Sequence, residues 1–126
     1  MDQDYDANEC REEYIADMKA KGYRVVYPAP DELQIDIDTE EHFQLFERQF
    51  ESLKREYGDI YFILNPSRNG LPGQHATITM PFALSNAERI AWQAALGSDP
   101  FRELMSLFRL KRGDSSPTIF IEKGVS

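Results

Sequence analysis

The sequence predicts an α+β protein in which an antiparallel-rich sheet has helices packed on one face. Three stretches support this prediction. Residues 33–38 and residues 74–80 alternate apolar and polar side chains with a period of two, as half-buried strands do. Residues 43–57 place aromatic and aliphatic side chains on one helical stripe. A helix that is apolar on one side can cover such a sheet, so we expect a layered domain.

The length of 126 residues predicts a single domain over residues 1–126, with an N-terminal helix and strand in residues 1–30 and a core in residues 31–123. No apolar run approaches the roughly 18 residues that span a bilayer, and the first residues are acidic, unlike a signal peptide. Cys10 is the only cysteine, which excludes a disulfide framework. We therefore expect a cytoplasmic protein without a membrane partner.

Charge is unevenly distributed along the chain. Residues 1–63 contain 17 acidic and 7 basic residues, whereas residues 64–126 contain 5 acidic and 7 basic residues. Four of the basic residues lie close together in sequence, namely Arg102, Arg109, Lys111 and Arg112. Two solvated surfaces of opposite sign would explain this. The alternative is an acidic metal site in the first half that faces a phosphate-binding edge from the second.

The N-terminal signals predict a helix over residues 9–21, which Gly22 ends, and a strand over residues 23–27. Pro28 and Pro30 then favour a turn, because proline fixes φ and has no N–H group to donate. We expect this strand to form a hairpin with the strand at residues 33–38.

The strongest helical signal begins at Thr39, a predicted N-cap, and ends at Gly58. Its apolar stripe consists of Phe43, Phe46, Phe50, Leu53 and Tyr57. A continuous apolar run at residues 60–64 is typical of a central strand. Turn-forming residues at 66–73 predict a loop before the strand at 74–80.

Ser85 can cap a helix over residues 86–96, and a further helix is expected to start at Pro100. The predicted inner stripe of that helix is Phe101, Leu104, Met105 and Phe108. A last strand is predicted at residues 118–122. Its side chains are expected to alternate, with Ile119 and Ile121 inward and Thr118, Phe120 and Glu122 outward.

Between residues 33 and 122 the predicted order is β-α-β-β-α-β, which is the ferredoxin-like order. One face of such a sheet is covered by helices and the other is open. The alternation then gathers Asp36, Asp38, His75 and Glu122 on the open face. Carboxylates beside a histidine and a glycine-rich loop can hold a divalent cation and nucleotide phosphates. Each of these side chains could equally be a solvated surface residue, so only their shared face favours a site.

Three motifs resemble the catalytic core of the archaeo-eukaryotic primase, or primase–polymerase, superfamily. Ile35-Asp36-Ile37-Asp38 resembles the family's hydrophobic-Asp-hydrophobic-Asp motif. The segment from Pro66 to His75, Pro-Ser-Arg-Asn-Gly-Leu-Pro-Gly-Gln-His, is similar to its Ser-Gly-x-His type of motif with a longer loop. Leu96-Gly97-Ser98-Asp99-Pro100, followed by Arg102, Arg109 and Gly113, resembles a stretch of plasmid and phage members.

The resemblance implies an RNA-recognition-motif-like fold and template-directed nucleotidyl transfer with Mg²⁺ or Mn²⁺ in phage or plasmid DNA replication. Its partners would be nucleotide triphosphates, a single-stranded DNA template and a replication helicase. The implied catalytic residues are Asp36, Asp38 and His75, and the implied metal ligands are Asp36, Asp38 and Glu122. The expected nucleotide-binding residues are Ser67, Arg68, Gly70, His75, Arg109 and Lys111.

Two other functions compete with this hypothesis. The acidic first half favours a non-enzymatic interaction protein, such as a phage-type inhibitor or DNA mimic on a degenerate nucleotide-binding fold, whose acidic helix surfaces imitate phosphates. A sheet-surface RNA binder could stack bases on Tyr61 and Phe120. The aspartates on that face would repel phosphates, which disfavours the RNA binder.

Overall fold

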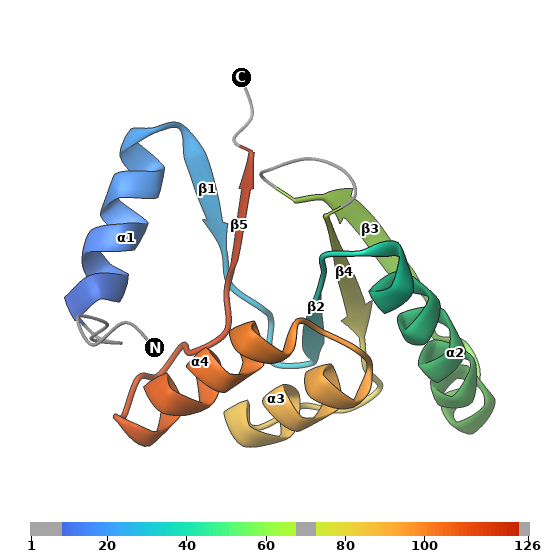
Figure 1. The fold of residues 1–126 in the computed structure, drawn as a ribbon. Coiled ribbons are helices and arrows are strands. Elements are labelled where there is room, and N and C mark those ends of the chain that lie inside the picture. The colour runs from blue at the N-terminus through green and yellow to red at the C-terminus, as the bar shows by residue number, and fades with distance from the viewer. Residues whose placement is uncertain (1–8, 68–72, 124–126) are drawn as a thin grey trace.

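The computed structural model describes residues 9–67 and 73–123, which form helices and two small antiparallel sheets (Figure 1). In chain order the elements are α1 (Glu9–Ala20), β1 (Tyr23–Val26), β2 (Glu32–Ile37), α2 (Glu40–Tyr57), β3 (Phe62–Pro66), β4 (Gln74–Thr79), α3 (Asn86–Ala95), α4 (Pro100–Lys111) and β5 (Phe120–Lys123). The α+β class is therefore confirmed. None of the described helices has the length and apolar character needed to cross a membrane.

The larger sheet has the strand order β2-β4-β3, so the two strands with alternating sequences are neighbours. In their antiparallel register Asp36 lies opposite His75. Helix α2 packs on one face of this sheet (Figure 1). There the ring of Phe62 lies 4.9 Å from that of Phe46 and 4.8 Å from that of Phe50, both edge-to-face. Phe46, Phe50 and Leu53 of the predicted stripe thus lie in the core and Phe43 packs against it, whereas Tyr57 is 36% exposed.

Both ends of α2 follow from the sequence. The Thr39 hydroxyl accepts a hydrogen bond from the backbone N–H of His42 at 3.1 Å, which caps the first turn. Gly58 ends the helix with φ +81°, a conformation that costs glycine little. Its N–H donates to the carbonyl of Lys54.

The expected hairpin between the first two strands is wrong. β1 pairs with β5 instead, and together they form a separate two-stranded sheet (Figure 1). β1 and β2 are linked by a side chain and not by a ladder of backbone hydrogen bonds: the Gln34 amide donates to the Val26 carbonyl at 3.0 Å. β1 cannot pair with β2 because the outer edge of β2 is already occupied.

That outer edge is satisfied by residues of α3, α4 and the turn between them. Five backbone groups of Glu32, Gln34 and Asp36 point away from β4. The Glu32 carbonyl accepts from Arg89 Nε. The Gln34 N–H donates to Gln93 Oε1, and the Gln34 carbonyl accepts from Arg102. The Asp36 N–H donates to Ser98 Oγ, and the Asp36 carbonyl accepts from the Asp99 N–H. Buried backbone groups need such partners. Three bonds to helices and two to the turn between them replace a fourth strand at this edge.

This arrangement corrects the predicted inner stripe of α4. Met105 is buried, but Phe101 is 63% exposed and Leu104 44% exposed, while Glu103 and Ser106 are buried in their place. Apolar side chains cannot form hydrogen bonds with the backbone N–H and C=O groups at the edge of a strand. The inner side of α4 is therefore polar.

The predicted facing of the last strand is also wrong. Phe120 and Glu122, expected to face outward, are 2% and 6% exposed, whereas Ile119 and Ile121 are half-buried. The reason is that Phe120 and Glu122 contact His75 of β4. β5 therefore covers part of the sheet face that the sequence predicts to be open.

Candidate functional site

Three aspartates converge at the C-terminal end of β2. Asp36 is the penultimate residue of the strand, Asp38 follows it, and Asp99 is the N-cap of α4. One carboxylate oxygen from each lies within 4.8 Å of those of the other two. The period-two alternation identifies Asp36 and Asp38. Asp99 is predictable only as a helix cap, so its place in the cluster was missed.

Asp99 reaches β2 through the turn that precedes α4. Its N–H donates to the Asp36 carbonyl at 2.8 Å, and the hydroxyl of Ser98 accepts from the Asp36 N–H at 2.9 Å. Gly97 makes this approach feasible, since it has φ +87° and a Cβ there would lie 3.3 Å from the Leu45 side chain. The turn is therefore held against β2 much as a neighbouring strand would be.

Glu103 organises the polar layer behind the cluster. It is 3% exposed and accepts hydrogen bonds from Gln93 at 2.9 Å, Ser98 at 2.7 Å and Arg102 at 2.8 Å. Each of these three side chains also bonds to the backbone of β2. A single buried carboxylate thus fixes the groups that hold the edge of β2.

The environment disfavours negative charge at the cluster. Burial raises the pKa of Asp36 to about 6, and the neighbouring Asp38 and Asp99 add to the rise while Arg102 opposes it. The pKa of Asp38 is also raised, by burial and then by Asp99. A bound cation would offset both effects, and carboxylate oxygens are the ligands that Mg²⁺ and Mn²⁺ prefer.

His75 lies on β4, directly across from Asp36. Its Nε2 is 3.8 Å from Asp36 Oδ1, and its Nδ1 is 3.2 Å from Glu122 Oε2. The imidazole stacks on the Phe120 ring, with centroids 3.9 Å apart and planes 4° from parallel. Burial lowers the pKa of His75, against the opposing effect of Glu122. The neutral imidazole is therefore favoured.

A cavity of about 590 Å³ opens beside these groups. Its lining includes Asp36, Asp38, Asp99 and His75, together with Ser67, Phe101, Arg102 and Arg109. Negative charge from β2 and α4 thus faces positive charge from α4 within one hollow. This volume is in the range of small-molecule sites.

The remaining predicted site residues have different placements. Ser67 and Arg109 line the cavity, whereas Lys111 is exposed and does not line it. Glu122 is not among the three clustered carboxylates and lies behind His75. Arg68 and Gly70 fall outside the described residues.

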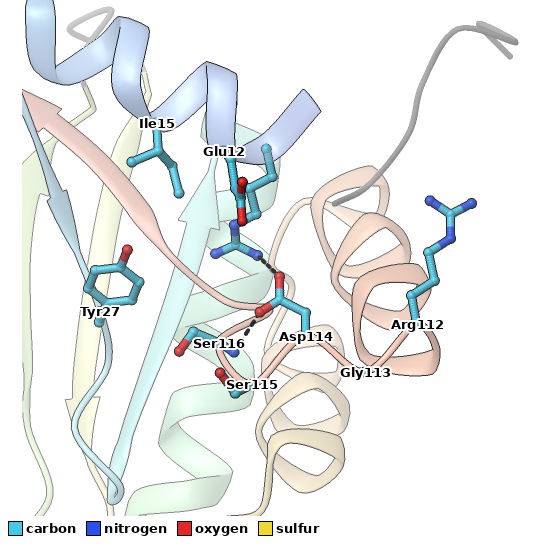
Figure 2. Close-up of a pocket in the computed structure, with 9 residues that line it drawn as sticks. Glu12, Ile15, Tyr27, Arg112, Gly113, Asp114, Ser115 and Ser116 are labelled. Atoms are coloured by element: carbon cyan, nitrogen blue, oxygen red, sulfur yellow. Dashed lines mark hydrogen bonds and ion pairs between the residues drawn. The ribbon is translucent and has the colours of Figure 1, made fainter. Parts of the chain in front are cut away.

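A second cavity, of about 720 Å³, lies between α1 and the loop after α4 (Figure 2). Its central polar contact ties the two together: Arg11 pairs with Asp114 at 3.2 Å, and Asp114 accepts from the Ser116 N–H at 2.8 Å. Figure 2 shows Arg112 directed away from this contact. These bonds explain how α1 is attached.

Comparison of the chain with protein-family models, with curated proteins and with solved structures finds no match. Function therefore has to be inferred from the geometry of the site and the chemistry of its residues.

Proposed function

We propose that this protein is a divalent-metal-dependent nucleotidyltransferase of primase–polymerase type. The observation that carries the proposal is the cavity in which three convergent aspartates share a lining with Arg109. Carboxylates for a cation and guanidinium groups for phosphates are the two requirements of phosphoryl transfer on a nucleotide triphosphate.

Each residue has a definite task in this proposal. Asp36, Asp38 and Asp99 would hold Mg²⁺ or Mn²⁺, which supplies charge neutralisation at the phosphates and lowers the pKa of an attacking hydroxyl. Arg109 would bind the triphosphate, and Ser67 would donate a hydrogen bond to it. The exposed ring of Phe101 offers a stacking surface for a base at the mouth of the cavity.

The narrower parts of the proposal come from sequence resemblance. The primase–polymerase resemblance of Ile35–Asp38 and of the segment ending at His75 favours DNA-templated synthesis over other phosphoryl transfers. It also favours single-stranded DNA and a replication helicase of a phage or plasmid as partners. Asp36 and His75 lie opposite each other on the neighbouring strands β2 and β4, which is compatible with that resemblance.

Metal binding and nucleotide incorporation test the proposal separately. Calorimetry with Mn²⁺ should detect binding to the wild-type protein, and labelled nucleotides should be incorporated on a single-stranded DNA template. Asp36→Asn combined with Asp38→Asn should abolish both signals, because it removes two of the three anionic ligands. Asp59→Asn is the matched control, since Asp59 is exposed and does not line the cavity. Absence of Mn²⁺ and Mg²⁺ binding to the wild-type protein would overturn the proposal.

A non-enzymatic acidic interaction protein is the second candidate. The observation that favours it is that five glutamates of α2 are all exposed: Glu40, Glu41, Glu47, Glu51 and Glu56. Such a protein would compete with duplex DNA for a cationic DNA-binding domain. Replacing these glutamates by glutamine should then abolish competition, whereas Asp36→Asn should leave it unchanged.

A further inference from the structure

The contacts of His75 extend away from the cavity through a buried carboxylate. Glu122 accepts from His75 at one oxygen and from Arg24 at the other, at 3.2 and 3.0 Å. The side chains of His75 and Glu122 are each 8% exposed, whereas that of Arg24 is 55% exposed. The row of contacts thus runs from solvent at β1, through β5, to the Asp36 side of β4.

This row fixes which imidazole nitrogen carries the proton. An ionised carboxylate only accepts hydrogen bonds, so the Nδ1 atom of His75 must be the donor to Glu122. In the neutral imidazole the proton then resides on Nδ1, and Nε2 presents a lone pair toward Asp36. Stacking on Phe120 prevents the ring from turning away.

A lone pair beside a carboxylate is suited to a cation and not to a phosphate. Contact with phosphate oxygens, which the family resemblance implies for His75, would require an N–H at Nε2. Two ligand atoms that each lie about 2.1 Å from one ion can be up to about 4.2 Å apart. The 3.8 Å between His75 Nε2 and Asp36 Oδ1 is within that span.

We propose that His75 Nε2 is a metal ligand shared with Asp36, and that Glu122 is the positioning residue that presents it. Metal-binding histidines commonly donate their other N–H to a carboxylate in this way. The proposal rests on the proposed function, because it assigns a further ligand to an ion held by Asp36. No His75 nitrogen lies within 4.8 Å of all three clustered carboxylates, so His75 would reach the ion from the Asp36 side.

The added nitrogen determines which cations the site prefers. Mg²⁺ favours oxygen ligands, whereas Mn²⁺, Co²⁺ and Zn²⁺ accept imidazole and bind more tightly along that series. The wild-type site should therefore select Mn²⁺ or Co²⁺ over Mg²⁺. Removing the nitrogen should therefore reduce the affinity for Mn²⁺ and Co²⁺ more than the affinity for Mg²⁺.

Mn²⁺ electron spin-echo spectroscopy detects a directly bound nitrogen, so it tests the proposal without any activity assay. The wild-type protein with Mn²⁺ should show ¹⁴N modulation, and His75→Asn should remove it. His42→Asn is the matched control, because His42 is the other histidine of the chain and it lies near Asp38. Modulation that persists in His75→Asn, or disappears only in His42→Asn, would refute the assignment.

Glu122→Gln tests the positioning role. It keeps the shape of the side chain but weakens acceptance from Nδ1, so Mn²⁺ affinity should fall about 10- to 100-fold, the usual effect of losing such a carboxylate. Mg²⁺ affinity should change less than about twofold, which a general loss of folding would not produce. Equal losses for both ions would contradict the role of Glu122. If Glu122→Gln does not fold, the comparison of the two histidine variants decides the proposal.

The failure of this inference differs from the failure of the proposed function. Mn²⁺ binding without ¹⁴N modulation removes His75 from the ligand set and leaves the three-aspartate site standing. If the wild-type protein binds neither Mn²⁺ nor Mg²⁺, both proposals are overturned.

Discussion

Asp36→Asn should stabilise the metal-free protein, and by an amount that depends on pH. The pKa of Asp36 is about 6 in the folded chain and 3.8 ordinarily. Because the pKa of Asp36 is raised in the folded chain, ionisation of this carboxyl lowers the stability of the fold. The stability is intact below pH 3.8, is lost as the pH rises toward 6, and the loss is complete above about pH 6. At 1.36 kcal/mol per pKa unit, this loss is about 3 kcal/mol at pH 8 and roughly half a kcal/mol at pH 4. Asparagine has nearly the same shape without the charge, so it should recover most of that difference.

Urea denaturation of both proteins at pH 4 and pH 8, with a chelator present, measures this difference. Asp59→Asn, on an exposed loop, should change the free energy of unfolding by less than about 0.5 kcal/mol at either pH. Saturating Mn²⁺ should stabilise the wild-type protein more than Asp36→Asn, because the variant lacks one of the three anionic ligands. An Asp36→Asn variant that is less stable than wild type at pH 8, or a gain that is equal at both pH values, would refute the reasoning.

Two further substitutions test the layer that supports the cluster. Glu103→Ala leaves Gln93, Ser98 and Arg102 without their shared acceptor, so the free energy of unfolding should fall by about 3–5 kcal/mol in urea denaturation; a loss below about 1 kcal/mol would contradict its organising role. Gly97→Ala places a side chain at φ +87° and against Leu45, so it should cost about 1–2 kcal/mol and also weaken Mn²⁺ binding in calorimetry. Unchanged Mn²⁺ affinity in that variant would show that the turn does not position its aspartate.

Local signals were sufficient to predict most helices and strands. The stripe of α2, its Thr39 cap and its Gly58 stop all depend on neighbouring residues, and each is confirmed. Pairing depends on residues far apart, which is why the β1–β5 sheet was not predicted. The inner face of α4 was wrong for a related reason: its polar side chains are buried only because they meet the edge of β2, a partner that periodicity does not reveal.

The candidate site likewise contains residues that local sequence patterns predict and residues that only distant contacts bring together. Alternation places Asp36 and Asp38 on one face, and the register of Asp36 with His75 follows from neighbouring strands. Asp99 is brought to them by backbone bonds between the turn before α4 and β2. Glu122 is on the other sheet, where it pairs across from Arg24, so its two oxygens accept from His75 and Arg24 and do not join the aspartates.

The capped edge of β2 also limits how copies of this protein can associate. A sheet can be extended by another chain only where a strand presents unpaired N–H and C=O groups. β2 presents none of its outer groups, because helices α3 and α4 and their connecting turn have bonded them. In the described part of the chain, the three-stranded sheet can therefore accept a strand only at β3. Two copies that joined there would use up the β3 edge of each three-stranded sheet, so among the described strands this sheet allows a closed dimer but not an open-ended fibril.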